Sequence, residues 1–197
     1  MERVPHVCGA CVFWESSDEL ERRCGVRCDR DAAGDWFSQV LNEWGECGRV
    51  VVEDDEPLGF IKYAPSGYFP QVATFPSAPE DPDVPFIACL HISPEARGRG
   101  LGRVLLQAAL RDLASRGYRK VQAIGYAPPL ADPGETPMPG VAFLLGHGFT
   151  VAGAHPVYPL LELELRSLAL ITENLENVLE SLRLPLRAPR QAPVPWT

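Results

Sequence analysis

The sequence predicts a mixed α/β fold, in which helices flank one sheet of parallel and antiparallel strands. Two observations support this fold class. The apolar runs 49–53 and 58–64 are joined by an acidic turn, which is typical of a β-hairpin. The apolar run 86–92 leads through a glycine-rich turn into helical periodicity up to Ser115, and another apolar run, 119–126, follows. This order predicts a right-handed strand–helix–strand crossover.

The remaining elements follow from periodicity and from the positions of the prolines. Apolar residues recur at helical spacing over 35–44, directly before Gly45, so we expect a short amphipathic helix there. Residues 64–85 contain six prolines, which predicts a long loop without a regular element that either covers a pocket or only connects two strands. A proline-rich link, 128–139, leads to the last elements of the domain. These are a short helix at 141–145 and strands near 149–152 and 160–165.

The length of the chain bounds its domain organisation. It has 197 residues, of which 46% are hydrophobic, and this is enough for one core. We expect a single domain over 1–165, which includes a cysteine-containing arm at 1–34. One helical face is apolar over 166–184, which predicts an amphipathic helix that docks on its own domain or on a second copy. The chain is therefore expected to be a monomer or a homodimer, with a disordered proline-rich tail at 185–197.

The charge of the chain bounds its partners. Its formal net charge of −8 argues against nucleic acid, because binding a phosphate backbone requires a concentrated basic surface. A cationic amine substrate suits this charge better. The sequence contains no run of about twenty apolar residues and no signal peptide, so we expect a cytoplasmic protein that does not bind membranes.

The cysteines of the N-terminal arm allow two interpretations. Four of them come close to the spacing of four-thiolate zinc sites: Cys8, Cys11, Cys24 and Cys28. Cys11 also runs directly into an apolar segment, 12–14, where a buried thiol would serve equally well. We expect no metal, and keep a zinc-stabilised interaction protein as an alternative. Cys47 and Cys89 lie in or beside strand-like runs and are expected to be core thiols.

The most informative motif is the turn Arg97-Gly98-Arg99-Gly100-Leu101-Gly102, which lies between an apolar run and a helical pattern. Glycines let the main chain approach an anion closely, and a helix start supplies open N–H groups that favour phosphate. The dinucleotide fingerprint is excluded, because Arg103 or Leu105 stands where its last glycine is required. A triphosphate-binding loop with its Gly-Lys pair is absent from the sequence. The remaining alternatives are a diphosphate cradle and a glycine-rich turn before an ordinary surface helix.

Two stretches resemble the GNAT-type N-acetyltransferase superfamily. Residues 84–117 resemble its acetyl-coenzyme A (acetyl-CoA) motif, with Arg97, Gly100 and Gly102 at the places of the pattern Arg/Gln-x-x-Gly-x-Gly. Residues 141–149 resemble its second signature, in which a helix ends at a glycine followed by phenylalanine. The resemblance implies a seven-stranded mixed sheet and acetyl-CoA as cosubstrate. It also implies direct transfer of the acetyl group to a primary amine of a small molecule, or of a protein or peptide, in a ternary complex.

The resemblance also assigns the coenzyme-binding residues. Backbone groups of Leu90, His91 and Ile92 would hold the pantetheine arm and polarise the thioester carbonyl. N–H groups of the following turn, helped by its arginine side chains, would bind the diphosphate. This set consists of Arg97, Gly98, Arg99, Gly100, Leu101, Gly102 and Arg103.

The catalytic residues are open, because the chain departs from the family pattern at two places. Leu144 follows Phe143 where the family has the tyrosine that protonates the thiolate, and Ile87 stands where some relatives have a glutamate base. Our candidates for the base are His91, Glu53 or water. The acid is expected to be Tyr126, His147, Tyr158 or water; His155, in a turn, is a weaker candidate for catalysis. The missing tyrosine supports an alternative function, a catalytically inactive coenzyme-binding sensor or interaction module.

Overall fold

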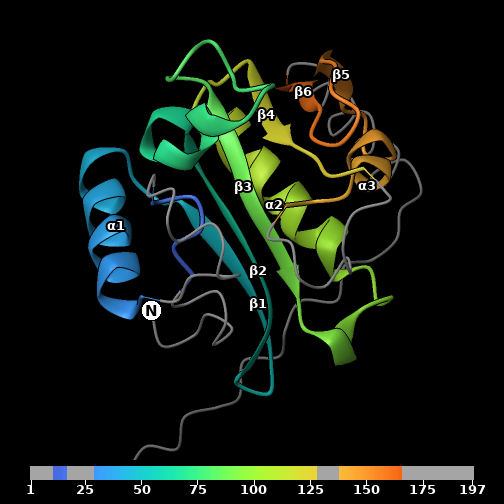
Figure 1. The fold of residues 1–197 in the computed structure, drawn as a ribbon. Coiled ribbons are helices and arrows are strands. Elements are labelled where there is room, and N and C mark those ends of the chain that lie inside the picture. The colour runs from blue at the N-terminus through green and yellow to red at the C-terminus, as the bar shows by residue number, and fades with distance from the viewer. Residues whose placement is uncertain (1–10, 17–28, 128–137, 166–197) are drawn as a thin grey trace, which may run out of the picture. The chain divides into compact units, whose positions relative to one another are not determined.

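The computed structural model describes residues 11–16, 29–127 and 138–165 (Figure 1). Within these residues one mixed sheet contains six strands in the order β1-β2-β3-β4-β6-β5. β3 and β4 are parallel, and the other neighbours are antiparallel. The mixed α/β class is confirmed, while the described part of the chain has six strands in place of the expected seven. The strands are β1 (Gly48–Glu53), β2 (Glu56–Pro65), β3 (Pro85–Ile92), β4 (Lys120–Ile124), β5 (Thr150–Gly153) and β6 (Leu160–Glu164).

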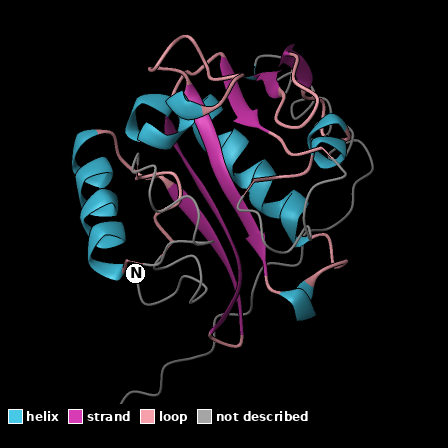
Figure 2. Cartoon of the chain, viewed as in Figure 1, coloured by secondary structure: helices cyan, strands magenta, loops and turns pink. Residues whose placement is uncertain are grey.

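In the part of the chain that the structure describes, three α-helices accompany the sheet (Figure 2): α1 (Arg30–Glu43), α2 (Leu101–Ser115) and α3 (Val141–Leu145). α3 has the predicted bounds, and α2 ends at Ser115 as predicted. α1 begins earlier than predicted, because the Asp29 side chain caps it by accepting a hydrogen bond of 2.9 Å from the N–H of Ala32. Among the described residues, no helix has the length and apolar character needed to cross a membrane.

The proline-rich segment 64–85 is more regular than predicted. It contains two short 3-10 helices, Ser66–Tyr68 and Pro70–Thr74. Pro70 occupies the first turn of the second one, where a missing N–H costs nothing. The prediction of a loop without any regular element was therefore wrong for the first half of this segment.

The two faces of the sheet are covered by different structures. α2 packs on one face of β1, β2 and β3 and buries five apolar side chains: Leu105, Leu106, Ala109, Leu110 and Leu113. An aromatic cluster forms much of the rest of the core. Its buried rings come from residues 11–16, from α1, from the 3-10 segment and from β2 and β3, and they are Trp14, Trp36, Phe60, Phe69 and Phe86. We call the side of the sheet that this cluster covers the aromatic face.

The sheet opens at the end of β3. A bulge interrupts its pairing with β2, because Lys62 lies opposite Cys89 whereas Tyr63 lies opposite Ile87. On its other side β3 pairs with β4 only at Phe86, opposite Gln122. The last residues of β3 therefore have a partner strand on the β2 side but none on the β4 side within the described part of the chain.

Candidate functional site

The open end of β3 lines a cavity of about 260 Å³. The other walls come from the start of α2, from the residue after β4 and from the segment that leads into α3. The lining residues are Leu90, His91, Ile92, Arg97, Gly102, Tyr126, Met138, Pro139, Gly140 and Phe143. An apolar concave site with a few polar groups is typical of small-molecule binding. The cavity brings together six of the residues that the sequence predicted for the site, from Leu90 to Tyr126.

The turn between β3 and α2 requires glycine at two positions. Gly98 and Gly100 have φ values of +77° and +80°, in the left-handed region that side chains rarely adopt. No atom lies within 4 Å of a Cβ built at either position, so the requirement comes from the backbone conformation and not from lack of space. Gly100 precedes α2 as its N-cap and supplies no capping side chain.

This turn leaves a row of backbone donors open. The N–H groups of residues 98–103 donate to no acceptor within the described part of the chain, and the first helical bond runs from Val104 N–H to Gly100 O at 3.2 Å. The N–H of Arg97, which the sequence analysis placed in the same set, instead donates to Pro94 O at 3.3 Å. Six consecutive donors therefore lie at the positive end of the α2 dipole, an arrangement that favours phosphate groups.

The two arginine side chains of the turn go to different places. Arg97 lines the cavity, and its Nε donates to Ile92 O at 3.2 Å. Arg99 instead forms a two-point ion pair with Glu53 at the end of β1, with Nη1–Oε2 at 3.0 Å and Nη2–Oε1 at 2.5 Å. The hydrogen bond and the charge of Arg99 lower the pKa of Glu53, and those of Glu53 raise the pKa of Arg99. Glu53 does not line the cavity, so the structure does not place this predicted base at the site.

His91 is half-buried at the end of β3. Burial, and then the nearby positive charge of Arg97, lower its pKa below the ordinary value of 6.5, against a smaller opposing effect of Glu95. The imidazole is therefore neutral at neutral pH and able to accept a proton. His91 lies opposite Phe60 in the antiparallel pair, so its side chain is on the aromatic face.

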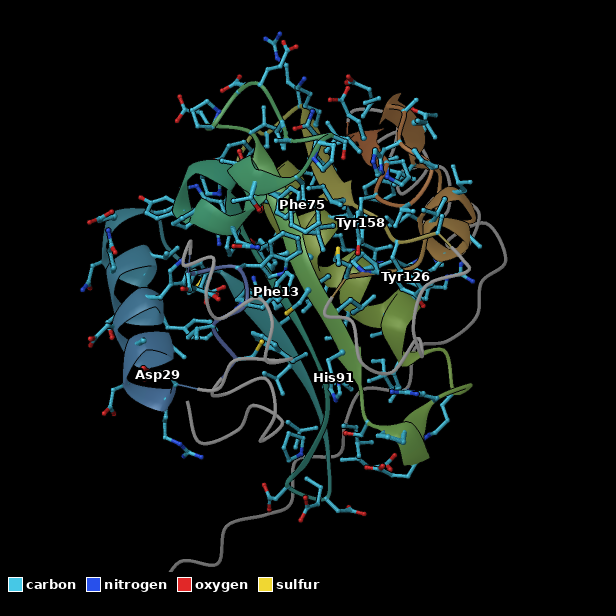
Figure 3. The ribbon with its side chains drawn as sticks, in the orientation of Figure 1. Phe13, Asp29, Phe75, His91, Tyr126 and Tyr158 are labelled. Carbon is cyan, nitrogen blue, oxygen red and sulfur yellow. The ribbon has the colours of Figure 1, made fainter. Side chains whose placement is uncertain are left out.

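Tyr126 lines the cavity from the side opposite β3, and Figure 3 shows it on a different segment from His91. Its backbone is fixed on both sides. Its N–H donates to Pro139 O at 3.2 Å, and its carbonyl accepts from Val141 N–H at 3.0 Å. These bonds hold the tyrosine at the wall that α3 also forms.

The other predicted candidates for proton transfer do not line this cavity. His147 Nδ1 lies 2.7 Å from Phe143 O. His155 Nδ1 accepts backbone N–H groups of Val157 and Tyr158 at 3.2 and 2.9 Å. The Tyr158 ring packs edge-on against Phe75 with their centroids 5.3 Å apart (Figure 3). These contacts give the three side chains structural roles in turns and in the core.

The sequence analysis missed one wall of the cavity, formed by Met138, Pro139 and Gly140. These residues end the proline-rich link, and the only signal was that the link precedes a family signature. The second signature itself divides between cavity and core: Phe143 faces the cavity, whereas Leu144 is fully buried.

A buried ion pair was also missed. Lys62 and Glu15 form it on the aromatic face, with side-chain exposures of 2% and 7%. The ammonium of Lys62 lies 5.2 Å from the centroid of the Trp36 ring. Burial is the largest single influence and acts to lower the pKa of Lys62. The charge and the hydrogen bond of Glu15, together with the nearby thiols of Cys89 and Cys11, outweigh it, so the pKa is raised and the lysine stays charged. A lysine inside the apolar run 58–64 was the signal that could have revealed such a pair.

The zinc hypothesis concerns four cysteines, of which the structure describes Cys11. Cys8, Cys24 and Cys28 lie outside the described residues, as do the predicted helix 166–184 and tail 185–197. Residues 11–16, 29–127 and 138–165 contain no group of three or more His, Cys, Asp or Glu side chains that could hold a metal ion. Cys47 and Cys89 are buried as predicted, and burial raises the pKa of the Cys47 thiol to about 11.

Comparisons with known proteins agree with this fold. The chain aligns with an N-acetyltransferase structure from Staphylococcus aureus Mu50 at 20% identity and a TM-score of 0.50, over 71% of this chain and 79% of that one. It aligns with the GNAT-like decarboxylase GphF, solved with isobutyryl-CoA, at 18% identity and a TM-score of 0.51, over 74% and 91% of the two chains. These likenesses show the fold. No curated protein sequence matches the chain.

The family itself is shown by a sequence model. The model of the acetyltransferase (GNAT) family matches residues 13–128, which is more than half of the chain and includes the open turn and most of the sheet. The chain therefore belongs to the GNAT acetyltransferase family.

Proposed function

We propose that this protein is an N-acetyltransferase that moves an acetyl group from acetyl-CoA to a primary amine of a small molecule, or of a protein or peptide. The observation that carries the proposal is the row of open N–H groups at 98–103, which lies next to the cavity at the open end of β3. The row fits a diphosphate. The apolar cavity beside it fits the pantetheine arm of the same coenzyme.

The diphosphate and the pantetheine arm of the coenzyme each have residues that would hold them. The N–H groups of 98–103 and the Arg97 guanidinium would bind the diphosphate. On the unpaired edge of β3, the backbone groups of Leu90 and the N–H of Ile92 would bind the pantetheine amides and the thioester carbonyl, whereas the backbone groups of His91 face β2. When bound, acetyl-CoA supplies an activated acyl group, and the residues around it orient it and exclude water.

The amine would reach the thioester from the aromatic face. A Cβ built at Gly102 in α2 would lie 3.8 Å from Leu90 Cδ2, so the Leu90 side chain is on the α2 face, whereas the neighbouring His91 is on the opposite one. Neutral His91 would accept a proton from the amine, directly or through water. Attack forms the C–N bond and breaks the C–S bond, and the Tyr126 hydroxyl would protonate the leaving thiolate. The net charge of −8 favours a cationic acceptor.

Thiol release from acetyl-CoA with a panel of primary amines tests this function. We expect His91→Gln and Tyr126→Phe to lower kcat by roughly 100-fold, the scale of acid–base catalysis, without changing the dissociation constant of acetyl-CoA. His147→Gln and Tyr158→Phe are matched controls outside the cavity, and they should keep most of the activity. Because the pKa of His91 is lowered, kcat/KM should rise with pH through a limb below pH 6.5 and then stay level. A limb that persists in His91→Gln would contradict the role of His91.

A second function is favoured by one specific observation. Leu144 is fully buried at the place of the family's proton-donating tyrosine, so the usual thiolate acid is missing. This supports an inactive coenzyme-binding sensor or interaction module. Tight binding of acetyl-CoA without turnover of any amine in the same panel would favour this alternative over the enzyme.

A further inference from the structure

The ion pair between Glu53 and Arg99 joins two segments that are 46 residues apart in the sequence. Glu53 ends β1 at the tip of the β1–β2 hairpin, and Arg99 lies in the middle of the open turn. Both carboxylate oxygens contact the guanidinium, at 3.0 and 2.5 Å. This two-point geometry is one in which a guanidinium also binds phosphate, so the carboxylate occupies the Nη1–Nη2 edge, which a phosphate could use.

The backbone and the side chain of Arg99 therefore have different surroundings. Its backbone N–H belongs to the row of open donors at 98–103, but its side chain is held by the hairpin. Arg97, by contrast, contacts no carboxylate within the described residues, and its side chain lines the cavity. A coenzyme diphosphate seated on the open N–H groups would lie close to Arg99 and would meet a guanidinium that is already paired.

A phosphate can replace Glu53 as the partner of Arg99, because the ion pair is exposed. The side chains are 45% and 53% exposed, so water screens the pair and it contributes little to stability. The other acidic residues of the hairpin tip, Asp54, Asp55 and Glu56, are exposed and add negative charge beside it. A diphosphate carries more charge than one carboxylate, and it would be held by the helix end as well.

We propose that Glu53 is an intramolecular competitor of the coenzyme: it holds Arg99 by the same two-point contact that the diphosphate uses, and the coenzyme must take Arg99 from it in order to bind. This inference rests on the proposed coenzyme site. It makes Glu53 a residue that sets coenzyme affinity, in place of the general base that the sequence suggested. The hairpin tip is released from the turn when the coenzyme is bound.

Calorimetric titration of the full chain with CoA tests this inference. We expect Glu53→Gln to bind CoA about two- to five-fold more tightly, the scale of an exposed ion pair. The matched control is Glu56→Gln, which removes the same charge from the same hairpin tip but contacts no arginine in the described residues. It should leave the affinity unchanged. In an Arg99→Ala background, Glu53→Gln should have no effect, because there is no longer a guanidinium to release.

Three results would overturn the inference. One is an unchanged affinity in Glu53→Gln. Another is an equal gain in Glu56→Gln or in the Arg99→Ala background, which would mean that Glu53 acts only by general repulsion. The third concerns the phosphate involved: the gain should persist with 3′-dephospho-CoA, and its loss there would assign Arg99 to the 3′-phosphate. If the unmodified protein binds no CoA, the proposed function fails; if it binds CoA with any of the three results, only the competition fails.

Discussion

The N-terminal and the C-terminal end of α2 differ in how their polar groups are hydrogen-bonded. At the N-terminal end, the N–H groups of residues 98–103 have no acceptor within the described part of the chain. At the C-terminal end, Asp112 accepts hydrogen bonds from Arg49 at 2.8 Å, from the Tyr63 hydroxyl at 2.9 Å and from Arg116 at 2.7 Å. One helix therefore combines an end that is available to a ligand with an end that joins it to β1 and β2. The variants below test this division, from the largest expected effect to the smallest.

Removing the carboxylate at the closed end should cause the largest loss of stability. Asp112 is 14% exposed and connects two arginines and a buried tyrosine hydroxyl, so Asp112→Ala leaves all three without this partner. We expect the free energy of unfolding in urea to fall by about 3 kcal/mol. Arg111→Ala, at the exposed neighbouring position, should change it by less than about 0.5 kcal/mol. A similarly small change of the unfolding free energy in Asp112→Ala would show that the contacts of Asp112 do not stabilise the packing of α2 on β1 and β2.

Removing a side chain at the N-terminal end of α2 should lower the affinity for the coenzyme and leave the stability almost unchanged. We expect Arg97→Ala to weaken binding of acetyl-CoA by about 2 kcal/mol, the scale of a charge-assisted hydrogen bond, with little change in urea denaturation. Arg103→Ala is the matched control, because its side chain is exposed and does not line the cavity. Equal losses of affinity in the two variants, measured by calorimetry, would contradict the separate placement of Arg97.

Adding one methyl group at either of two glycines of the turn should have the smallest effects. At one position it should lower stability, and at the other it should weaken coenzyme binding. Gly100→Ala places a side chain at φ +80° and should cost about 1 kcal/mol of unfolding free energy. Gly102→Ala meets only ordinary contacts, 3.6 to 3.8 Å from Phe143 and Leu90. It should therefore keep its stability while it narrows the cavity and weakens coenzyme binding. A stability loss at Gly102 as large as that at Gly100 would argue against this contrast.

Local patterns were enough to predict the elements around the site. The bounds of α3 and the end of α2 were predicted, because helical periodicity and flanking glycines are local signals. Open N–H groups were predicted over 97–103 because a helix start leaves its first N–H groups free. The N–H of Arg97 is the exception, since it donates to Pro94 O. The resemblance of two short stretches to one family predicted in addition that Leu90, His91 and Ile92 belong to the site, and all three line the cavity.

The parts that were missed depend on contacts between distant residues. Nothing near Glu53 in the sequence indicates that Arg99 neutralises it, and nothing near Arg99 indicates that its side chain leaves the turn. The wall formed by Met138, Pro139 and Gly140 requires knowing where β3 and β4 separate, which the register decides. The start of α1 was missed because its cap, Asp29, precedes the apolar pattern that marked the helix.

The pairing of Lys62 with Glu15 has a practical consequence for work on shortened forms of this chain. Glu15 belongs to the segment 11–16, and it supplies the negative charge for an ammonium that is almost completely removed from water. A form that starts after this segment would leave that ammonium among aromatic rings without a counter-ion, at a cost of several kcal/mol. Residues 11–16 should therefore be kept in any trimmed form made for crystallisation.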